Sequence, residues 1–334
     1  MSKVTIQLEE IRKLGRQVLE LYGATPEEAA LVTEDYLEAD LRGRFSHGLT
    51  FFKNAVQDFQ RRGKYEIGAF EGSYLHIEGN SDIGHVVARE AIDLALPKLA
   101  ERKIVSIGLS NISRFNTAGV IARYGAERGA VTLVFAYGGS SVVAPPGAKA
   151  AALNNTPIGI GIPHTDPLFV LDMATSERAW GHITVAKYNG EKIPQHWGVT
   201  EEGLPTEQPE QVKWLSPLGG YKGLGLGLAL EIISGALVRV PVGSKGPGRD
   251  RGALLLLIDP TIFGHTAESF KEQVSGFLGE LSEIPTVEGQ PSISYPGQGS
   301  EQRYQEGLDS GVITLHQSAI DYMHEQLKQA GRSI

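Results

Sequence analysis

Apolar residues recur at helical spacing near the start of the chain. Ile11, Leu14 and Val18 fall on one face of a helix, and Gly23 follows at a position where helices commonly end. The pattern predicts an amphipathic helix over residues 6–21.

The residues after Gly23 carry the signals of a second helix. Thr25 can cap the free backbone amides, Pro26 suits the first turn, and the two glutamates that follow face the positive end of the helix dipole. We expect this helix to end near Leu41 and a third helix to cover 49–62. Residues 1 to about 70 are therefore predicted to form a helical unit.

The pattern changes at Gly72, where short apolar runs begin to alternate with helical stretches. Strands are predicted at 74–77, 104–109, 131–135, 169–172 and 254–258, and helices near 86–99, 118–128 and 224–237. The fold class is therefore mixed α/β.

The remaining segments differ in periodicity. Residues 241–252 and 284–307 show little of it and are predicted as long loops. A last amphipathic helix at 318–330 is expected to pack on the N-terminal helices, because its apolar stripe needs a surface to cover.

Composition narrows the class of protein. The 334 residues are 41% hydrophobic, and the net charge of −8 argues against a nucleic-acid partner or an anionic membrane surface. Cysteine is absent, which excludes thiolate nucleophiles and disulfides. Charges interrupt the first 23 residues, and no apolar run approaches the about 20 residues that span a bilayer, so we expect a cytoplasmic protein without a signal peptide.

Ser46-His47-Gly48 is the first candidate for chemistry. His47 lies between two predicted helices, its neighbouring glycine lets a ligand approach, and its intrinsic pKa suits proton transfer near neutrality. A histidine at this position can equally cap the third helix, and on its own the motif favours the cap.

Two further motifs could bind anions. The run from Asp172 to Ser176 follows an apolar strand and presents hydroxyls and backbone amides, although any strand-to-helix turn can use such residues. The run from Gly219 to Gly225 combines glycines, Lys222 and a helix start, but it lacks the spacing of a Walker loop and is also typical of a tight turn. No Rossmann fingerprint and no metal-ligand spacing is present.

Together these segments resemble the malate/L-lactate dehydrogenase family of the second type, which includes ureidoglycolate dehydrogenase, diketogulonate reductase, sulfolactate dehydrogenase and the piperideine- or pyrroline-2-carboxylate reductases. The motifs that carry the resemblance span almost the whole chain: Ala39-Asp40-Leu41-Arg42-Gly43, Ser46-His47-Gly48, Asp172 to Ser176, Ala179-Trp180-Gly181, Ile193-Pro194, Gly203-Leu204-Pro205-Thr206 and Gly219 to Gly223.

The resemblance implies a non-Rossmann nicotinamide enzyme. Its central mixed-sheet domain, expected at 72–299, would bind the cofactor, and a helical domain would form from both termini, 1–71 with about 300–334. It also implies a homodimer that acts on a small-molecule substrate.

The resemblance also gives roles to individual residues. His47 matches the family's proton-donating histidine, with Ser46 beside it and His182 as a possible partner. The implied cofactor is NAD or NADP, no metal is expected, and the implied cofactor contacts are Asp172, Met173, Ala174, Thr175, Ser176, Lys222, Gly223, Gly297 and Gln298.

The substrate residues depart from the family pattern. Many relatives have an arginine three residues after the Ser-His-Gly glycine, where it can hold a carboxylate, but this chain has Phe51. A second family histidine is replaced by Arg114, and we hypothesise that Arg114 supplies the lost anion contact. An exposed loop arginine without such a role is the alternative.

Three other departures bear on specificity. His182 stands where the imine reductases carry an aspartate, and a second imidazole cannot support a positive charge as a carboxylate does, which disfavours the imine reaction. Thr156 belongs to an Asn-Asn-Thr-Pro segment where glycine-threonine-asparagine-proline is usual, and Gly138-Gly139 replaces polar residues near the cofactor.

These observations predict an NAD(P)H-dependent oxidoreductase that transfers a hydride between nicotinamide and a small 2-oxo or 2-hydroxy acid or its imine, with His47 moving the proton. The alternative is a relative without catalysis that serves as a small-molecule binding or subunit-interaction protein.

Overall fold

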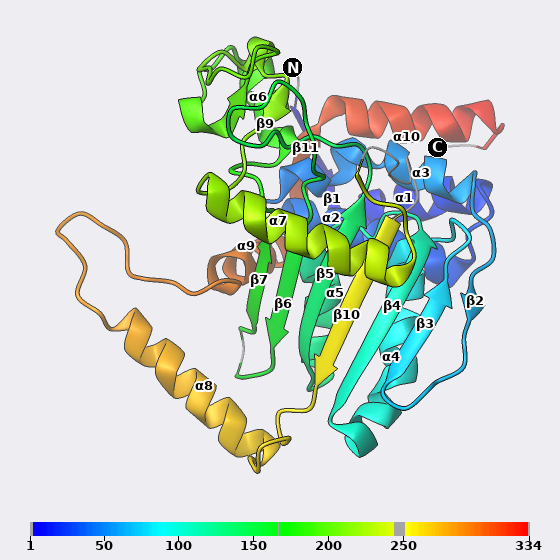
Figure 1. The fold of residues 1–334 in the computed structure, drawn as a ribbon. Coiled ribbons are helices and arrows are strands. Elements are labelled where there is room, and N and C mark those ends of the chain that lie inside the picture. The colour runs from blue at the N-terminus through cyan, green and yellow to red at the C-terminus, as the bar shows by residue number, and fades with distance from the viewer. Residues whose placement is uncertain (1–2, 166, 244–250, 333–334) are drawn as a thin grey trace.

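The computed structural model describes residues 3–165, 167–243 and 251–332 (Figure 1). The predicted loop at 241–252 therefore falls partly outside the described residues. The fold is mixed α/β, as predicted, with a layer of helices above the edge of one large sheet (Figure 1).

The N-terminal helices follow the sequence signals closely. Helix α1 covers Leu8–Leu21, and α2 covers Pro26–Leu41 with the predicted cap at Thr25, whose hydroxyl accepts from the amide of Glu28 while the Glu28 carboxylate accepts from the amide of Thr25. The third helix is shorter than predicted: two 3₁₀ turns, Phe45–His47 and Leu49–Phe51, precede α3 at Lys53–Phe59.

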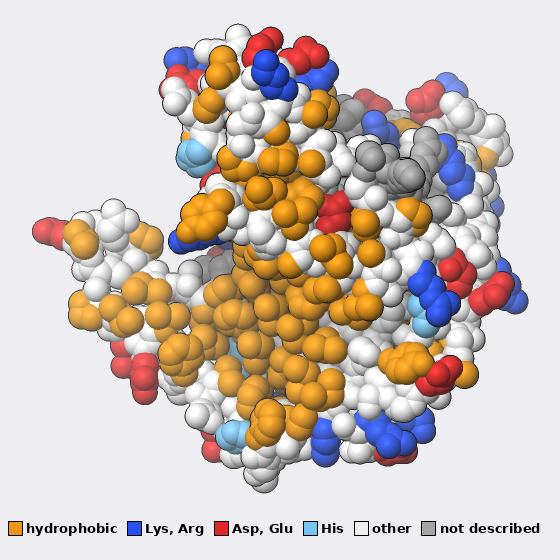
Figure 2. Space-filling view, viewed as in Figure 1, with side chains coloured by type: hydrophobic (Ala, Val, Ile, Leu, Met, Phe, Trp, Pro, Cys, Tyr) orange, Lys and Arg blue, Asp and Glu red, His pale blue; other side chains and the backbone are white. Residues whose placement is uncertain are grey.

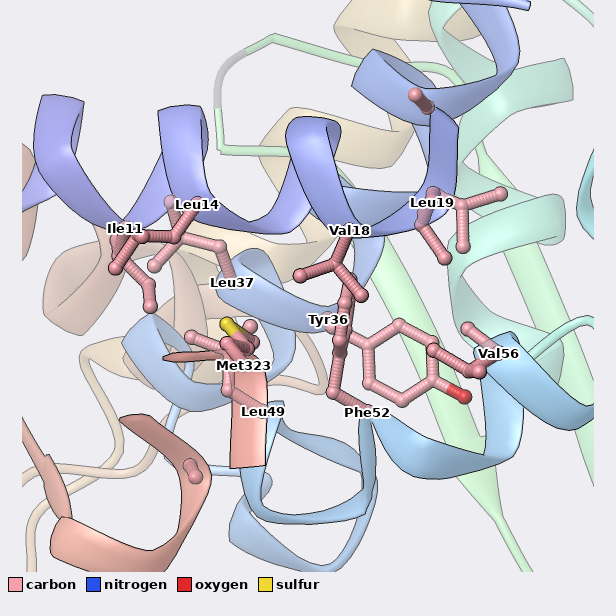
Figure 3. Packing of buried hydrophobic residues seen from close by; sticks show 14 of the residues in the cluster. Ile11, Leu14, Val18, Leu19, Tyr36, Leu37, Leu49, Phe52, Val56 and Met323 are labelled. Carbon is pink, nitrogen blue, oxygen red and sulfur yellow. The ribbon is translucent and has the colours of Figure 1, made fainter. Parts of the chain in front are cut away.

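The two ends of the chain pair with each other. Strand β1, Lys3–Gln7, lies antiparallel to β11, Val312–His316, so the first predicted helix begins two residues later than the pattern indicated. Helix α10, Gln317–Gln329, lies against α1. Figure 3 shows the shared core, in which Met323 of α10 lies among side chains of α1 and α2.

Seven strands form the central sheet in the order β2-β3-β4-β10-β5-β6-β7. Strands β3 and β4 run parallel to each other, and every other neighbouring pair in this sheet is antiparallel. This topology confirms that the fold is not a Rossmann fold, whose strands run parallel. The strands are β2 Glu66–Ile67, β3 Tyr74–Glu78, β4 Ile104–Ile112, β5 Val131–Gly138, β6 Ile158–Ile162, β7 Phe169–Met173 and β10 Arg251–Ile258.

Helices cover the two faces of this sheet unequally. Helices α4, Gly84–Arg102, and α5, Ala118–Glu127, lie behind it, while α7, Tyr221–Ser234, crosses the upper part of the front (Figure 1). The segment Tyr221–Val238 is long and apolar enough to cross a membrane by length and composition alone, but here it packs next to β5 and β10.

Three helices were missed by the periodicity. Helix α9, Gln298–Ser310, overlaps the last part of the predicted loop 284–307. It was missed because it is polar on nearly all sides and Ser300 is its one buried residue. Helix α8, Ala267–Ser282, projects from the body like an arm (Figure 1). Helix α6, Trp180–Asn189, belongs to a small lobe with the hairpin of β8, Gly198–Val199, and β9, Trp214–Leu215.

The sheet edge below the N-terminal helices brings distant parts of the chain together. Strands β4, β5 and β7 end there, and β6 and β10 begin there, because their neighbours run antiparallel to them. The proposed division into domains at 71/72 and about 299/300 stays a prediction.

Candidate active site

A cavity of about 900 Å³ lies at this sheet edge. Its walls come from the turn after α2, from α3, from the strand ends of β5 and β7, and from α6. The volume is at the upper end of the range for small-molecule sites, so it has room for a ligand larger than a small acid.

The turn that carries His47 is held by a buried carboxyl of α2. The Leu49 amide donates to Asp40 Oδ2 at 2.7 Å, and a Cβ on Gly48 would lie 1.9 Å from Asp40 Oδ1. Burial raises the pKa of Asp40 to about 7, against the opposing effect of the Leu49 amide. The Leu49 amide begins the 3₁₀ turn Leu49–Phe51 and has no partner within it, so Asp40 supplies the acceptor that this amide needs.

His47 lines the cavity within reach of three charged or titratable groups. Its Nδ1 lies 2.9 Å from Ser46 Oγ, a hydrogen-bond distance. Burial lowers the pKa of His47 below its usual value; Asp172 opposes this shift, and Arg44 and His182 add to it. This shift favours the neutral form of the imidazole.

Asp172 stands at the end of β7 and forms an ion pair with Arg44, three residues after the end of α2. Helix α5 packs against the same carboxyl through Gly119, where a Cβ would lie 2.6 Å from Asp172 Cβ. The ion pair links the His47 turn to the sheet, and the sequence pattern had given Arg44 no role.

Helix α6 forms another wall of the cavity. A Cβ on Gly181 would lie 2.4 Å from Ser46 Cβ, so the glycine lets the helix start contact the His47 turn. His182 follows on the same helix, with its ring edge-to-face against Trp197 at 6.3 Å between centroids. Burial and Arg178 lower the pKa of His182.

Four of the predicted cofactor residues lie together in the cavity wall: Asp172, Met173, Ala174 and Ser176. Ser176 Oγ donates to Asn155 Oδ1 and lies 2.7 Å from the carbonyl oxygen of Arg178, which ties this strand end to two neighbouring segments. Thr175 is not in the wall; its side chain is buried against Gly227 of α7.

The other four predicted cofactor residues are outside the cavity wall of this single chain. Lys222 is exposed in the first turn of α7, and Gly223 packs against Leu218, which does line the cavity. Gly297 lies beside the start of β7, where a Cβ would be 2.6 Å from the Leu168 carbonyl oxygen, and Gln298 begins α9 next to it. Their cofactor roles stay predictions.

Of the three predicted substrate residues, two line the cavity and one does not. Phe51 and Arg114 line the cavity, whereas Thr156 is fully buried beside it, and its hydroxyl has no hydrogen-bond partner among the described residues. Arg114 is held: its Nη1 donates to the Asn54 carbonyl and to Asp58 Oδ1, both at 3.0 Å.

Sequence reasoning missed many residues of the wall, among them Tyr36, Asn54, Asn154 and Arg251. Tyr36 and Asn54 are part of helices, so periodicity assigned them no role. Arg251 was placed in a loop, but it is the first residue of β10 and pairs with Gly138 of β5. The unusual glycines at 138 and 139 were the signal that could have pointed to a large neighbour.

Comparisons with known proteins agree with this architecture. Residues 6–324 match the family model described as malate/L-lactate dehydrogenase. The chain is 31% identical over 290 residues to the malate/(S)-sulfolactate dehydrogenase of Methanothermus fervidus, covering 83% of this chain and 85% of that one. It is 26% identical over 323 residues to the ureidoglycolate dehydrogenase (NAD(+)) of Escherichia coli K12, covering 92% and 91%.

A solved structure shows the same fold. The sulfolactate dehydrogenase from Methanocaldococcus jannaschii superposes with a TM-score of 0.89 and 26% identity, over 99% of this chain and 98% of that one.

The contact between Gly48 and Asp40 gives a direct test of the His47 turn. We expect Gly48→Ala to lower the free energy of unfolding by about 1–3 kcal/mol, because the new methyl group overlaps a buried carboxyl that cannot move without losing its amide donor. Urea denaturation measures the change. The control is Gly279→Ala in α8, where a Cβ meets nothing within 4 Å and helix propensity predicts a gain of up to about 1 kcal/mol. Equal stability of Gly48→Ala and wild type would contradict the packing described.

Proposed function

Since the chain belongs to the malate/L-lactate dehydrogenase family, we propose that it transfers a hydride between NAD(H) or NADP(H) and a small 2-oxo or 2-hydroxy acid or its imine, with His47 moving the proton. The observation that carries this proposal is the meeting of two segments 125 residues apart, the His47 turn and the Asp172 strand end, in one cavity wall. A proton donor and a polar strand end beside a large cavity are what such a reaction requires.

The residues present fit a nicotinamide dinucleotide. The cavity is large, its wall at Met173 and Ala174 has small or flexible side chains, and the nearby Thr156 hydroxyl is buried without a partner among the described residues. Asp172 and Ser176 offer acceptors and hydroxyls for ribose groups, and the exposed Lys222 at the start of α7 can meet a phosphate. When bound, the nicotinamide supplies or accepts the hydride.

His47 carries the proton. Ser46 is positioned at Nδ1, which leaves Nε2 as the nitrogen for the substrate oxygen or nitrogen. In reduction the protonated ring donates from Nε2; in oxidation the neutral ring accepts there. Burial, Arg44 and His182 lower the pKa of His47, and Asp172 opposes them, so Asp172 supplies the negative charge that supports the imidazolium.

The substrate is proposed to bind between His47 and Arg114, with Phe51 as an apolar neighbour and Thr156 behind the wall. Arg114 is proposed as a contact for the acid group. Its bonds to Asp58 and to the Asn54 carbonyl fix its guanidinium in place, which reduces the entropy lost on binding.

We also propose that two copies of the chain form a homodimer. The front of the sheet and the helices around it present a broad apolar surface (Figure 2), with exposed Leu228 and Ile232 on α7 and Phe277 on α8. Monomers rarely leave contiguous apolar surface of this extent in water. The projecting α8 arm, apolar along the side seen in Figure 2, is suited to clasp a second copy.

The role of His47 is tested by His47→Gln, which removes proton transfer but keeps a polar side chain. We expect kcat to fall by about 10²–10⁴-fold, with cofactor binding, measured by quenching of NADH or NADPH fluorescence, changed by less than about threefold. His324→Gln on α10 is the matched control and should behave as wild type. Full turnover of His47→Gln would refute the assignment. Cofactor binding without any turnover by the wild type would instead favour a binding protein.

The pH dependence of 2-hydroxy acid oxidation tests the surroundings of His47. Oxidation needs the neutral ring, so kcat/KM should fall as the pH drops through a pKa that lies below the usual value for histidine. A positive charge at position 182 lowers this pKa, so His182→Gln should move the acid limb to higher pH and His182→Lys to lower pH. Shifts of the same sign in both variants would contradict the electrostatic account.

The proposed dimer is tested by sedimentation velocity at micromolar concentration. Wild type should sediment as a dimer and Leu228→Asp as a monomer, because a charge in the apolar surface must lose its hydration when the interface forms. The control is Leu94→Asp on α4, an exposed leucine behind the sheet. A monomeric wild type, or a dimeric Leu228→Asp with a monomeric Leu94→Asp, would rule out this interface.

A further inference from the structure

Arg251 is one of the arginines that line the cavity, and it lies on a strand next to the one that leads to Arg114. Arg251 begins β10, between Ile112 at the end of β4 and Gly138 at the end of β5. Arg114 follows β4 by two residues, so the two arginines come from adjacent strands at the same sheet edge. Both line the cavity.

Two glycines make room for the Arg251 side chain. Gly138 has φ of +139°, and a Cβ there would lie 2.4 Å from Arg251 Cγ. A Cβ on Gly139 would lie 3.5 Å from Arg251 Nη2. The guanidinium therefore lies over bare backbone at the end of β5, which accounts for the two glycines that stand out in the sequence.

The charges around this end of the cavity favour an anion. Arg114 contacts Asp58 at 3.0 Å. Burial raises the pKa of Asp58, and the positive charges of Arg114 and Arg251 both oppose this shift. Both arginines also influence the Tyr36 hydroxyl, whose ring packs against Phe52 in the core (Figure 3). The charges of two guanidinium groups thus act on one partly buried carboxyl and one phenol hydroxyl.

The two arginines are separate from the residues proposed for proton transfer, His47 and Asp172. Three strand spacings, β10 to β5 to β6 to β7, lie between Arg251 and Asp172, which is roughly 14 Å of backbone. The pKa of His47 responds to Arg44, Asp172 and His182, on its own side of the cavity. His47, Arg114 and Arg251 nevertheless line one cavity, so an acid held at His47 meets the arginines through their long side chains, which extend from the strand ends toward it.

We propose that Arg251, beside Arg114, binds the acid group of the substrate and is the residue that makes the enzyme selective for acids although Phe51 offers no charge. The proposal rests on the proposed oxidoreductase function. Arg251 can meet a carboxylate through two parallel N–H donors, a geometry that lysine cannot reproduce. Arg114, fixed by Asp58, forms the second side of the same subsite.

The first test compares Arg251→Gln, Arg251→Lys and Arg114→Gln with wild type, using a 2-oxo acid and its methyl ester as paired substrates. We expect Arg251→Gln to raise KM for the acid by about 10–100-fold, with kcat changed by less than about threefold, and to lower the preference for acid over ester by a similar factor. Arg251→Lys should lie between. Arg239→Gln, outside the cavity at the end of the turn after α7, is the charge-matched control.

Specific outcomes would overturn the proposal. An equal loss for acid and ester would mean that Arg251 acts through structure alone. A higher KM for NADH or NADPH with an unchanged KM for the acid would assign Arg251 to the cofactor. Gly138→Ala adds a positioning test: because the methyl group displaces the Arg251 stem, it should raise KM for the acid in the same direction.

A binding measurement separates this proposal from the proposed function. Oxalate should raise the melting temperature of the wild-type protein, and this rise should be lost in Arg251→Gln but kept in Arg239→Gln. A wild type that binds oxalate through Arg251 without turning over any acid would contradict the proposed function alone. An equal oxalate effect in Arg251→Gln and wild type would contradict the role of Arg251, whatever the activity.

Discussion

The ion pair between Arg44 and Asp172 is the interaction on which the site depends. It joins the turn after α2 to the end of β7, two segments that are 128 residues apart in the sequence. Both side chains are largely shielded from water, so removing one partner would leave a poorly solvated charge beside the cavity. Because His47 lies three residues after Arg44, the same pair positions the imidazole and sets the electric field around it.

Close contacts through glycine bring the remaining elements to this pair. Gly48 lets the His47 turn reach Asp40, Gly119 lets α5 reach Asp172, and Gly181 lets α6 reach Ser46. At each position a Cβ would come within 2.6 Å of a neighbouring atom. The cavity wall is thus assembled from backbone contacts that larger residues would prevent, which explains why glycine recurs in the Ser-His-Gly and Ala-Trp-Gly motifs.

The sequence predicted the parts of the fold that follow local rules. The cap at Thr25, the end of α2 at Leu41 and the strand before Asp172 are encoded by neighbouring residues, and His47 and Asp172 do meet in one cavity. Helix α9 escaped prediction because it has almost no apolar face. Arg251 escaped because its place depends on pairing with β5, more than a hundred residues earlier, and no local pattern encodes such a pairing.

The central claim is that this cavity supports hydride transfer to the carbon that bears the reacting oxygen or nitrogen. The most direct measurement is the reaction of wild-type protein with nicotinamide cofactor deuterated at C4, in each stereochemical form, and a 2-oxo acid. The account predicts oxidised cofactor and a product with deuterium on C2 from one of the two forms. A reduced product without deuterium on C2 from either form would contradict it.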